Sequence, residues 1–476
     1  MEIPSSPKEF NPDIQSKQSD HKGSVDLLLL NHSNLQTNLV YPYAFVQLSA
    51  LARRHGLTVV CHDLVGRTGN NLECFLDQRL REYRPRMIGI TLRQTDTLIG
   101  GMYLPPEPTK LKNGYFPVHD TKNLIELLRE YTDSPVIVGG FGFSVHAQRN
   151  MEFLKPDYGV RDAPDEIFER FDDLLTRSHL ESIQNLLWWR GKKLVENKQS
   201  YYGPLQHPEY TAETLADLQH FYGRSHFSKS IPIELARGCP YRCFFCSEPF
   251  VKGKKVRMRA WDAVFADVEL IARSGYTKIW FVCSELNMGN NRLPLELARK
   301  ITEFKQSKGL DFFWAAYYLP RWLSKQDMDI LLASGFQPSW NDYVSLDDEN
   351  LKRAGVPYRA KHILEAMSIQ DSLSEPGGDN GPVQDATLED QRFTRENLTW
   401  FLGNPYVTKT TFRTTIQKVE AAGLAEKSRA GGITNLTRVF DHGSGPRSGM
   451  AAQIRSITPE GEVDYNPVFP SYFECD

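Results

Sequence analysis

The stretch ELARGCPYRCFFCSEPF, Glu234 to Phe250, holds three of the chain's seven cysteines, Cys239, Cys243 and Cys246, in the spacing C-x3-C-x2-C. Structural zinc sites commonly take four ligands, often as two separated C-x2-C pairs. The sequence offers neither a second pair nor a histidine near this loop. Electron-transfer iron–sulfur clusters also normally take four protein ligands. Three cysteines in one tight loop instead fit a [4Fe-4S] cluster with one iron left open to a substrate or cofactor.

The composition is that of a soluble globular protein. The chain has 476 residues, of which 40% are hydrophobic and 24% charged, so two or three domains are expected. A formal net charge of -3 gives no reason to expect nucleic acid or an anionic membrane as a partner. Since no apolar run reaches the roughly 18 residues of a membrane span, and the N-terminal residues 1–23 lack a secretory core, we expect a cytoplasmic protein.

Strand and helix patterns alternate on the C-terminal side of the cysteine loop. A strand pattern leads into the loop, and a helix pattern with apolar residues at helical spacing ends on Gly275, a C-cap signal. Two further strand patterns, 277–287 and 310–319, are each followed by a helix pattern, the second with Ser324 as a candidate N-cap. This rhythm predicts a parallel sheet covered by helices.

The C-x3-C-x2-C loop, with the aromatic Phe245 before its last cysteine, resembles that of the radical S-adenosylmethionine (SAM) superfamily. The resemblance implies that Cys239, Cys243 and Cys246 hold a [4Fe-4S] cluster and that SAM chelates the fourth iron. It also implies a partial (β/α)6 barrel over residues 230–445. An external electron donor of the flavodoxin or ferredoxin type is then expected, because an electron from the cluster breaks the sulfonium S–C5′ bond in that superfamily.

Active sites of parallel barrels gather at the carboxyl ends of the strands. Glu285 and Asn287 lie at the end of the second predicted strand, where the superfamily usually places a polar or acidic contact to the SAM amino group. Asn341 and Asp342, after the segment GFQPSW (335–340), lie near the end of an expected fourth strand in the same sense. These four residues are therefore candidates for binding the cofactor.

Residues 24–180 predict a separate domain. Five β/α units follow one another there, which indicates a doubly wound, flavodoxin-like Rossmann sheet whose ligands bind outside the carboxyl ends of its strands. Gly139, Gly140 and Gly142 after the fourth strand permit close backbone approach to a ligand, although a generic βα turn also accounts for them.

The same half resembles the cobalamin-binding domain that precedes many radical SAM barrels. The segments IGITLRQTD, VIVGGFGFS and DYGVRDAPDEIF carry the likeness, which implies that Arg93 and the three glycines line a corrin pocket. The D-x-H-x-x-G motif of other cobalamin proteins is absent, and His32 is the alternative for a lower ligand.

Together the two resemblances cover about residues 24–445 and point to the cobalamin-dependent radical SAM enzymes, in the branch that contains tryptophan 2-C-methyltransferase. They imply methyl transfer to a carbon or other poorly nucleophilic centre of a small metabolite or peptide. Around the two domains we expect a linker at 181–229, a polar insertion at 371–396 and a C-terminal tail at 446–476.

Several alternatives stay open. Residues 404–424 fit either a barrel helix, which we favour, or a helix-turn-helix with Lys409, Arg413 and Lys418 on its recognition helix. In the barrel, Arg438 and His442 would lie near the active-site rim. The protein could be a radical SAM enzyme without cobalamin that performs a rearrangement or transfers another SAM-derived group. It could also be a redox-sensing iron–sulfur protein that binds DNA.

Overall fold

The structure is a computed structural model that describes residues 23–31, 42–64, 67, 69–92, 117–222, 230–243, 246–338, 348, 351–352 and 355–373, with four short strands further on. It divides into two compact units, Met1–His226 and Phe227–Asp476. In both units parallel strands are connected by helices, which confirms the predicted α/β class.

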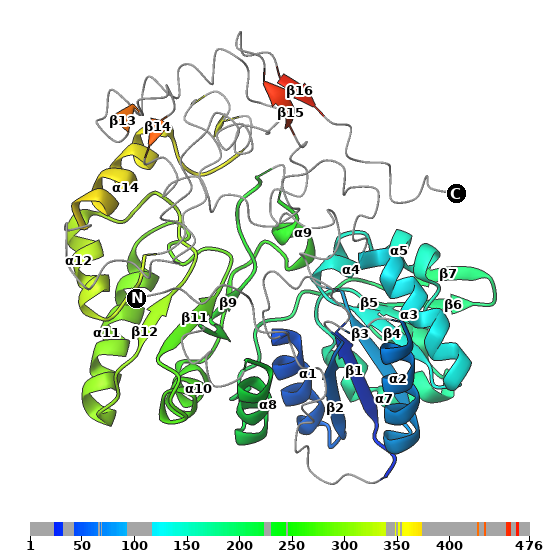
Figure 1. The fold of residues 1–476 in the computed structure, drawn as a ribbon. Helices are drawn as coiled ribbons and strands as arrows, with labels where there is room; N and C mark the ends of the chain where they lie inside the picture. Colours follow the sequence, from blue (N-terminus) through cyan, green and yellow to red (C-terminus); the bar gives the residue numbers. More distant parts are fainter. Residues whose placement is uncertain are drawn as a thin grey trace. The chain divides into compact units, whose positions relative to one another are not determined.

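The first unit is built on a seven-stranded sheet in the order β2-β1-β3-β4-β5-β6-β7 (Figure 1). Its first five strands are parallel: β1 (Leu27–Asn31), β2 (Val59–Asp63), β3 (Met87–Thr91), β4 (Val136–Gly139) and β5 (Tyr158–Val160). All residues of β1 and β3 are buried. The continuous apolar runs of the sequence therefore mark strands covered on both faces.

Helices lie on both faces of this sheet (Figure 1). Helix α1 packs beside α6, whereas α2, α3 and α5 pack beside one another. The arrangement follows from the strand order: because β1 lies between β2 and β3, the chain leaves β1 in one direction and returns on its other side. The helices are α1 (Tyr43–Arg54), α2 (Gly69–Tyr83), α3 (Pro117–Tyr131), α4 (Phe141–Val145), α5 (Ala147–Leu154), α6 (Asp165–Glu169), α7 (Phe171–Thr176) and α8 (Ala212–Tyr222).

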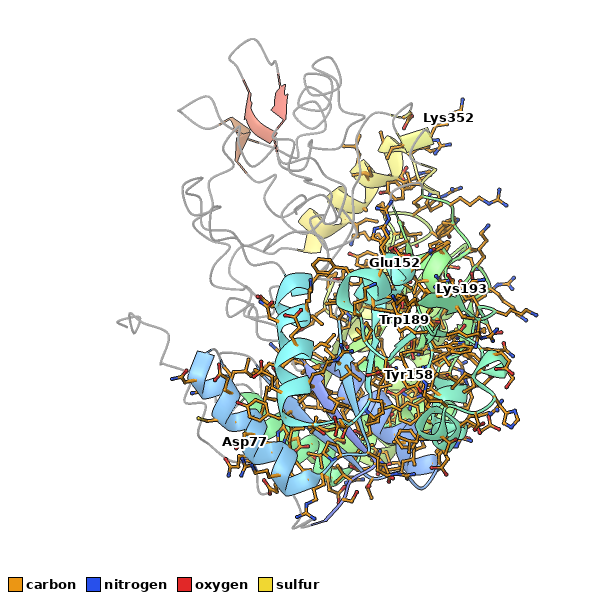
Figure 2. The ribbon with its side chains drawn as sticks, turned by 90° about the vertical axis from the view of Figure 1, so that its right-hand side faces the viewer. Asp77, Glu152, Tyr158, Trp189, Lys193 and Lys352 are labelled. Carbon is orange, nitrogen blue, oxygen red and sulfur yellow. The ribbon has the colours of Figure 1, made fainter. Side chains whose placement is uncertain are left out.

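Part of the predicted linker 181–229 belongs to this sheet. The hairpin of β6 (Leu186–Arg190) and β7 (Lys193–Glu196) adds two antiparallel strands beside β5. Trp188 is buried and donates to Asn197 Oδ1 at 3.2 Å, and the Trp189 indole donates to the Pro156 carbonyl at 2.9 Å. Figure 2 labels Trp189 of β6 and Tyr158 of the adjacent strand β5. The two tryptophans thus have partners within the first unit.

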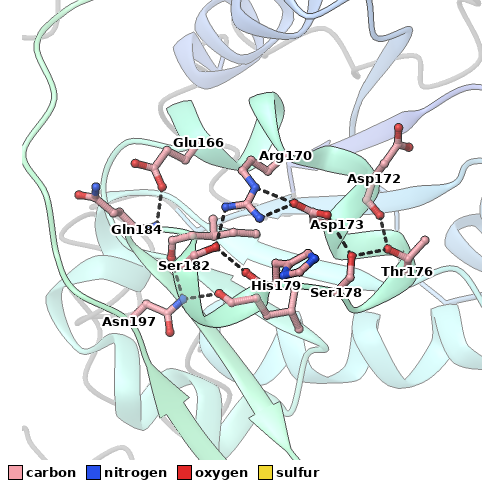
Figure 3. A network of polar contacts seen from close by, with 12 residues as sticks. Glu166, Arg170, Asp172, Asp173, Thr176, Ser178, His179, Ser182, Gln184 and Asn197 are labelled. Atoms are coloured by element: carbon pink, nitrogen blue, oxygen red, sulfur yellow. Dashed lines mark hydrogen bonds and ion pairs between the residues drawn. The ribbon is translucent and has the colours of Figure 1, made fainter.

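A polar network closes the irregular turn between α7 and β6 (Figure 3). Arg170 donates to Asp173 and to the Ser182 hydroxyl, both at 2.6 Å. The Asn197 amide donates to the Ile183 carbonyl at 2.7 Å, and the Glu166 carboxylate accepts from the Gln184 N–H at 2.7 Å. Side chains therefore satisfy backbone groups that have no partner in a helix or strand.

The second unit contains three parallel strands in the order β12-β11-β8: β8 (Ile231–Glu234), β11 (Lys278–Val282) and β12 (Phe313–Ala315). Helices α10 (Trp261–Arg273) and α11 (Arg292–Lys308) connect them, and α12 (Lys325–Ala333) follows. Phe336 then forms a parallel bridge with Trp314. Each strand lies beside the preceding one, so the sheet grows in a single direction, unlike that of the first unit.

Four further elements lie near the cysteine loop in sequence or later in this unit. Strands β9 (Ala236–Arg237) and β10 (Arg257–Met258) form an antiparallel pair that encloses the loop in sequence. The loop is followed by the single-turn helix α9 (Glu248–Val251), and α14 (Ala360–Leu373) lies further along the chain.

The helix ends predicted from the sequence are confirmed. Gly275 follows α10 with φ +91°, as a C-terminal glycine should. Ser324 caps α12: its hydroxyl accepts the Asp327 N–H, and the Asp327 side chain accepts from the Ser324 backbone. These local signals needed no tertiary contact to be recognised.

Beyond Leu373 the structure describes two antiparallel pairs, β13 (Glu426–Lys427) with β14 (Ile433–Thr434) and β15 (Ile454–Ile457) with β16 (Val463–Tyr465). The alternatives for 404–424, most of the predicted insertion, Arg438 and His442 lie outside the described residues. Of the helices described, none combines the length and apolar character that crossing a membrane requires.

We expect Gly140→Ala to destabilise the first unit by about 3 kcal/mol, because φ +99° and ψ 168° belong to a region almost restricted to glycine. An added Cβ would also lie 2.5 Å from the Leu92 carbonyl oxygen. Hydrogen exchange of the β3 and β4 amides measures the loss. The control is Gly191→Ala: φ is +61° and nothing lies within 4 Å, so about 1 kcal/mol is expected. Equal losses would contradict a role for the Leu92 contact.

Candidate functional site

The cysteine loop begins at a backbone position that only glycine can occupy. Gly238 has φ +98°, and a Cβ there would overlap the Lys255 carbonyl oxygen. The next residue, Cys239, donates its backbone N–H to the Gly253 carbonyl at 3.0 Å. The loop is thus pressed against the segment that leads into β10, and this contact sets the direction in which the cysteines enter the site.

Two ion pairs hold the base of the loop. Arg237 binds the Glu234 carboxylate through two parallel hydrogen bonds of 2.8 and 2.7 Å. Arg259 and Asp267 form a fully buried pair at 2.6 Å, which joins the end of β10 to α10. Bidentate arginine–carboxylate pairs fix orientation as well as distance. The strand end, the β9–β10 pair and the first helix therefore form one rigid frame around the loop.

The three cysteine thiols lie close enough to influence one another. Burial raises the pKa of Cys239 to about 12, and the charges of Cys246, Glu248 and Glu285 add to the rise. Burial likewise raises the pKa of Cys243 to about 12, with contributions from Cys246 and Cys239. The thiols of Cys239 and Cys243 are therefore protonated in the metal-free loop, and binding of iron would displace their protons.

The chemistry of the donor set fits a [4Fe-4S] cluster, in which each thiolate binds a different iron. Cys239 is buried, and Cys243 and Cys246 are half-buried. Within the described parts of the chain, no three His, Cys, Asp or Glu side chains form a group that could hold a metal ion.

A strap formed by residues 355–358 lies against the cysteine loop. Gly355 has φ +70°, and a Cβ there would come within 2.7 Å of the Arg242 carbonyl oxygen. The Gly355 carbonyl accepts from the Cys243 thiol at 3.8 Å, and Pro357 accepts from Arg321. Val356 and Tyr358 are buried. The strap therefore restricts access to Cys243.

The carboxyl end of β11 brings acidic and polar groups to the same place. Glu285 is 6% exposed, and its charge contributes to the raised pKa of Cys239 and of Cys243. The Ser284 hydroxyl donates to Glu248 Oε2 at 2.8 Å and lies 3.4 Å from the Gly238 carbonyl oxygen. The strand end and the cysteine loop are thus direct neighbours, as the strand-end argument predicted.

Asn287 lies at the same strand end, and its side-chain amide forms hydrogen bonds with the backbone of the segment after β12. It donates to the Leu319 and Arg321 carbonyls at 2.9 and 2.6 Å and accepts the Leu319 N–H at 2.7 Å. The side chain is completely buried. This geometry gives Asn287 a structural role, and its contact with a cofactor stays a prediction.

An aromatic pair beside the loop was missed from the sequence. The Tyr241 ring stacks on Trp322, with centroids 6.4 Å apart and planes at 10°. The Tyr241 hydroxyl accepts the Gly289 N–H at 2.7 Å, and Trp322 has φ +66°, an uncommon conformation for a bulky residue. No spacing rule links residues so far apart in sequence, so only the folded chain could reveal the pair.

The first unit carries its own candidate site at the carboxyl ends of β1 and β3. Asn31 is buried at the end of β1 and donates to Asp63 Oδ2 at 3.2 Å. Its Oδ1 atom has no hydrogen-bond partner among the residues described. A buried acceptor without a partner is uncommon in proteins, and an amide donor from a ligand would satisfy it.

The glycines predicted after β4 lie at the same edge of the sheet. A Cβ on Gly139 would meet the Val160 side chain at 2.6 Å, and Gly140 packs on the Leu92 backbone. The Gly142 N–H donates to the Leu92 carbonyl at 3.0 Å. In the described residues the glycines thus permit close approach of the protein's own chain, at the residue just before Arg93.

Several candidates lie outside the described residues: Arg93, Asn341, Asp342, His32 and Phe245. Their predicted roles stay predictions.

No family model matches the chain. It is 22% identical over 364 residues to tryptophan 2-C-methyltransferase of Streptomyces laurentii, an alignment that covers 66% of this chain and 58% of that protein. The chain thus spans less than two thirds of this relative's length.

Among solved structures, the chain resembles the radical SAM methyltransferase TsrM from Kitasatospora setae. The form with cobalamin and a [4Fe-4S] cluster has a TM-score of 0.62 at 21% identity, covering 73% of this chain and 67% of that one. The form with tryptophan and a SAM analogue has a TM-score of 0.66 at 20% identity, covering 84% and 72%.

The cobalamin-dependent SAM radical enzyme OxsB, with aqua-cobalamin and SAM, has a TM-score of 0.55 at 15% identity, covering 73% of this chain and 47% of that one. These likenesses establish the fold. They also confirm the resemblance drawn from the sequence: the curated relative is a tryptophan 2-C-methyltransferase, TsrM is a radical SAM methyltransferase with cobalamin and a [4Fe-4S] cluster bound, and OxsB is a cobalamin-dependent SAM radical enzyme.

We expect Asn287→Ala to lower the free energy of unfolding of the second unit by about 2 kcal/mol even without cofactors, because it leaves the buried backbone groups of Leu319 and Arg321 unpaired. Denaturant unfolding measures the change. The control is Asn290→Ala, at an exposed residue that only accepts from the Arg292 N–H, with a loss below about 1 kcal/mol. A stable Asn287→Ala protein with weakened SAM binding would contradict the structural role.

Proposed function

We propose that the chain is a cobalamin-dependent radical SAM methyltransferase that acts on a carbon or other poorly nucleophilic centre of a small metabolite or peptide. The observation that carries the proposal is the cysteine loop: the buried thiol of Cys239 and the half-buried thiols of Cys243 and Cys246, with the buried carboxylate of Glu285 near Cys239 and Cys243. When bound, the cluster, SAM and cobalamin supply the electron and methyl-group chemistry, and the protein supplies orientation and exclusion of water.

In this proposal Cys239, Cys243 and Cys246 hold the cluster, and the frame of Glu234–Arg237 and Arg259–Asp267 holds the loop. The strap at Gly355 shields Cys243 from solvent. A shielded loop suits a cluster whose electron must reach SAM rather than dissolved oxidants. The external electron donor, of the flavodoxin or ferredoxin type, remains an expectation from the resemblance.

Glu285 is the proposed partner of the SAM amino group. It is buried at a strand end beside the cysteines, where an ammonium group would compensate its charge. Asn341 and Asp342 are proposed as further contacts after the fourth strand. Asn287 contributes by holding the segment at Leu319–Arg321.

The strand order supports a partial (β/α)6 barrel in the second unit. Each of β8, β11 and β12 is parallel to and adjacent to the strand before it, and the Trp314–Phe336 bridge continues the series. Strands added always on the same side lead toward closure, and active sites of such barrels lie at the carboxyl ends. The cysteine loop and Glu285 both follow strand ends.

A corrin site is proposed in the first unit, as a Rossmann-like domain. Its parallel strands have the order 2-1-3-4-5, which places a ligand crevice between the ends of β1 and β3. Asn31 Oδ1 lies at the end of β1 and could accept from a corrin side-chain amide. Gly140 anchors Leu92 at the end of β3 and so determines where the segment of Arg93 begins.

TsrM contains cobalamin and a cluster in one structure and tryptophan in another, and OxsB contains aqua-cobalamin and SAM. These proteins support the cofactor set and a small-molecule substrate for this chain. The substrate itself differs among such enzymes, since function depends on the site and not on the fold.

The test is the cofactor content of protein purified without oxygen from cells supplied with cobalamin. We expect about four irons, four sulfides and one cobalt per chain, as the proposed cofactors require. Four irons without cobalt would favour the cobalamin-free radical SAM alternative. No iron after reconstitution would overturn the proposal as a whole.

We expect Cys239→Ala, Cys243→Ala and Cys246→Ala each to lose most of the bound iron and the cluster's visible absorption, because each removes one of three protein ligands. The control is Cys283→Ala, since Cys283 is as buried as Cys239 and directly follows β11, outside the loop. This control should retain the iron of the unaltered protein. Equal loss in all four variants would show that the assay reports folding and not ligation.

A further inference from the structure

The Glu248 carboxylate lies between the cysteine loop and the end of β11. It is two residues beyond Cys246, and its side chain is only 10% exposed. Its Oε2 accepts from the Ser284 hydroxyl at 2.8 Å, and that hydroxyl lies 3.4 Å from the carbonyl oxygen of Gly238, the residue before Cys239. The carboxylate is therefore held in a fixed position within two short contacts of the first cysteine's backbone.

A lysine lies beside the other oxygen of this carboxylate. Lys252 directly follows α9, its Nζ lies 3.3 Å from Glu248 Oε1, and its side chain is 23% exposed. Glu248 thus accepts a hydrogen bond from Ser284 on its buried side and forms an ion pair with Lys252 on its more exposed side. Lys252 contacts Glu248 from the side nearer to solvent, so a substitution of Lys252 leaves the core closed.

We propose that the Glu248–Lys252 pair controls how readily the cluster held by Cys239, Cys243 and Cys246 accepts an electron. The carboxylate opposes reduction and the ammonium offsets that opposition. The inference rests on the proposed function, because it requires the cluster. It assigns Glu248 and Lys252 as positioning and charge-setting residues that need not touch SAM or substrate.

The physical basis is the charge near the cluster. Reduction adds one negative charge to a group already bound by three thiolates, and a fixed carboxylate nearby makes that addition less favourable. Net charge and hydrogen bonding are among the factors that set cluster potentials. Because Glu248 is partly desolvated, its field is screened less than that of a surface carboxylate. Removing the acid and removing the base should therefore shift the potential in opposite directions.

The experiment compares Glu248→Gln and Lys252→Met in full-length protein carrying about four irons per chain. Glutamine keeps the volume and an oxygen that can accept from Ser284. The cluster's midpoint potential is measured by a redox titration followed by electron paramagnetic resonance. The titrant supplies one electron per cluster, and no bond forms or breaks.

We expect Glu248→Gln to raise the equilibrium constant for reduction about tenfold, a positive shift of ~59 mV for a one-electron couple. Lys252→Met should lower the same constant severalfold, and Lys252→Arg should restore the original potential. Two exposed residues serve as controls: Lys325→Met at the start of α12 and Glu303→Gln on α11 should leave the potential unchanged.

Shifts of opposite sign support the proposal, because a merely structural role predicts loss of iron or shifts of the same sign. If Glu248→Gln fails to bind iron, the shift in Lys252→Met decides by itself. Unchanged potentials in iron-loaded variants would overturn this inference and leave the proposed function standing. Absence of iron in the unaltered protein would overturn both.

Discussion

The structure of the second unit depends on the approach of the cysteine loop to the segment before β10. That approach is possible only because Gly238 lacks a side chain and adopts a positive φ, with the Lys255 carbonyl in the place of a Cβ. Once the loop lies against the segment before β10, the Glu234–Arg237 and Arg259–Asp267 ion pairs hold its base rigidly. Cys239 is buried there and Cys243 and Cys246 are half-buried, and removal from water raises the pKa of Cys239 and of Cys243.

The two units use the same local elements for different sheets. In the first, β1 lies between β2 and β3, so the strand order reverses there, which is where doubly wound sheets commonly bind ligands. In the second, each strand is added beside the last, so the order never reverses. The physical difference lies in the direction of each crossover. Because both arrangements place ligands at carboxyl ends, the polar residues of interest follow strands in both units.

Much of the fold could be predicted from the sequence because the signals are local. Buried strands such as β1 and β3 are continuous apolar runs, and Ser324 and Gly275 mark helix ends by their chemistry. The sequence predicts a linker where the structure has the hairpin of β6 and β7, because the spacing of its tryptophans does not distinguish a sheet edge from a connecting segment. Within the site, the spacing of the cysteines and the strand-end position of Glu285 were both readable.

The sequence by itself determined the C-x3-C-x2-C motif, the α/β class and the positions of most strands, because cysteine spacing, apolar periodicity and helix caps act over a few residues. Only the tertiary structure decided what surrounds the motif. Glu248 and Ser284 are 36 residues apart, Cys243 and Gly355 are 112 apart, and Tyr241 stacks on Trp322 from another loop. Such contacts depend on how the strands are ordered and on which carbonyls face each glycine. No local pattern encodes them, since they exist only once distant segments are packed together.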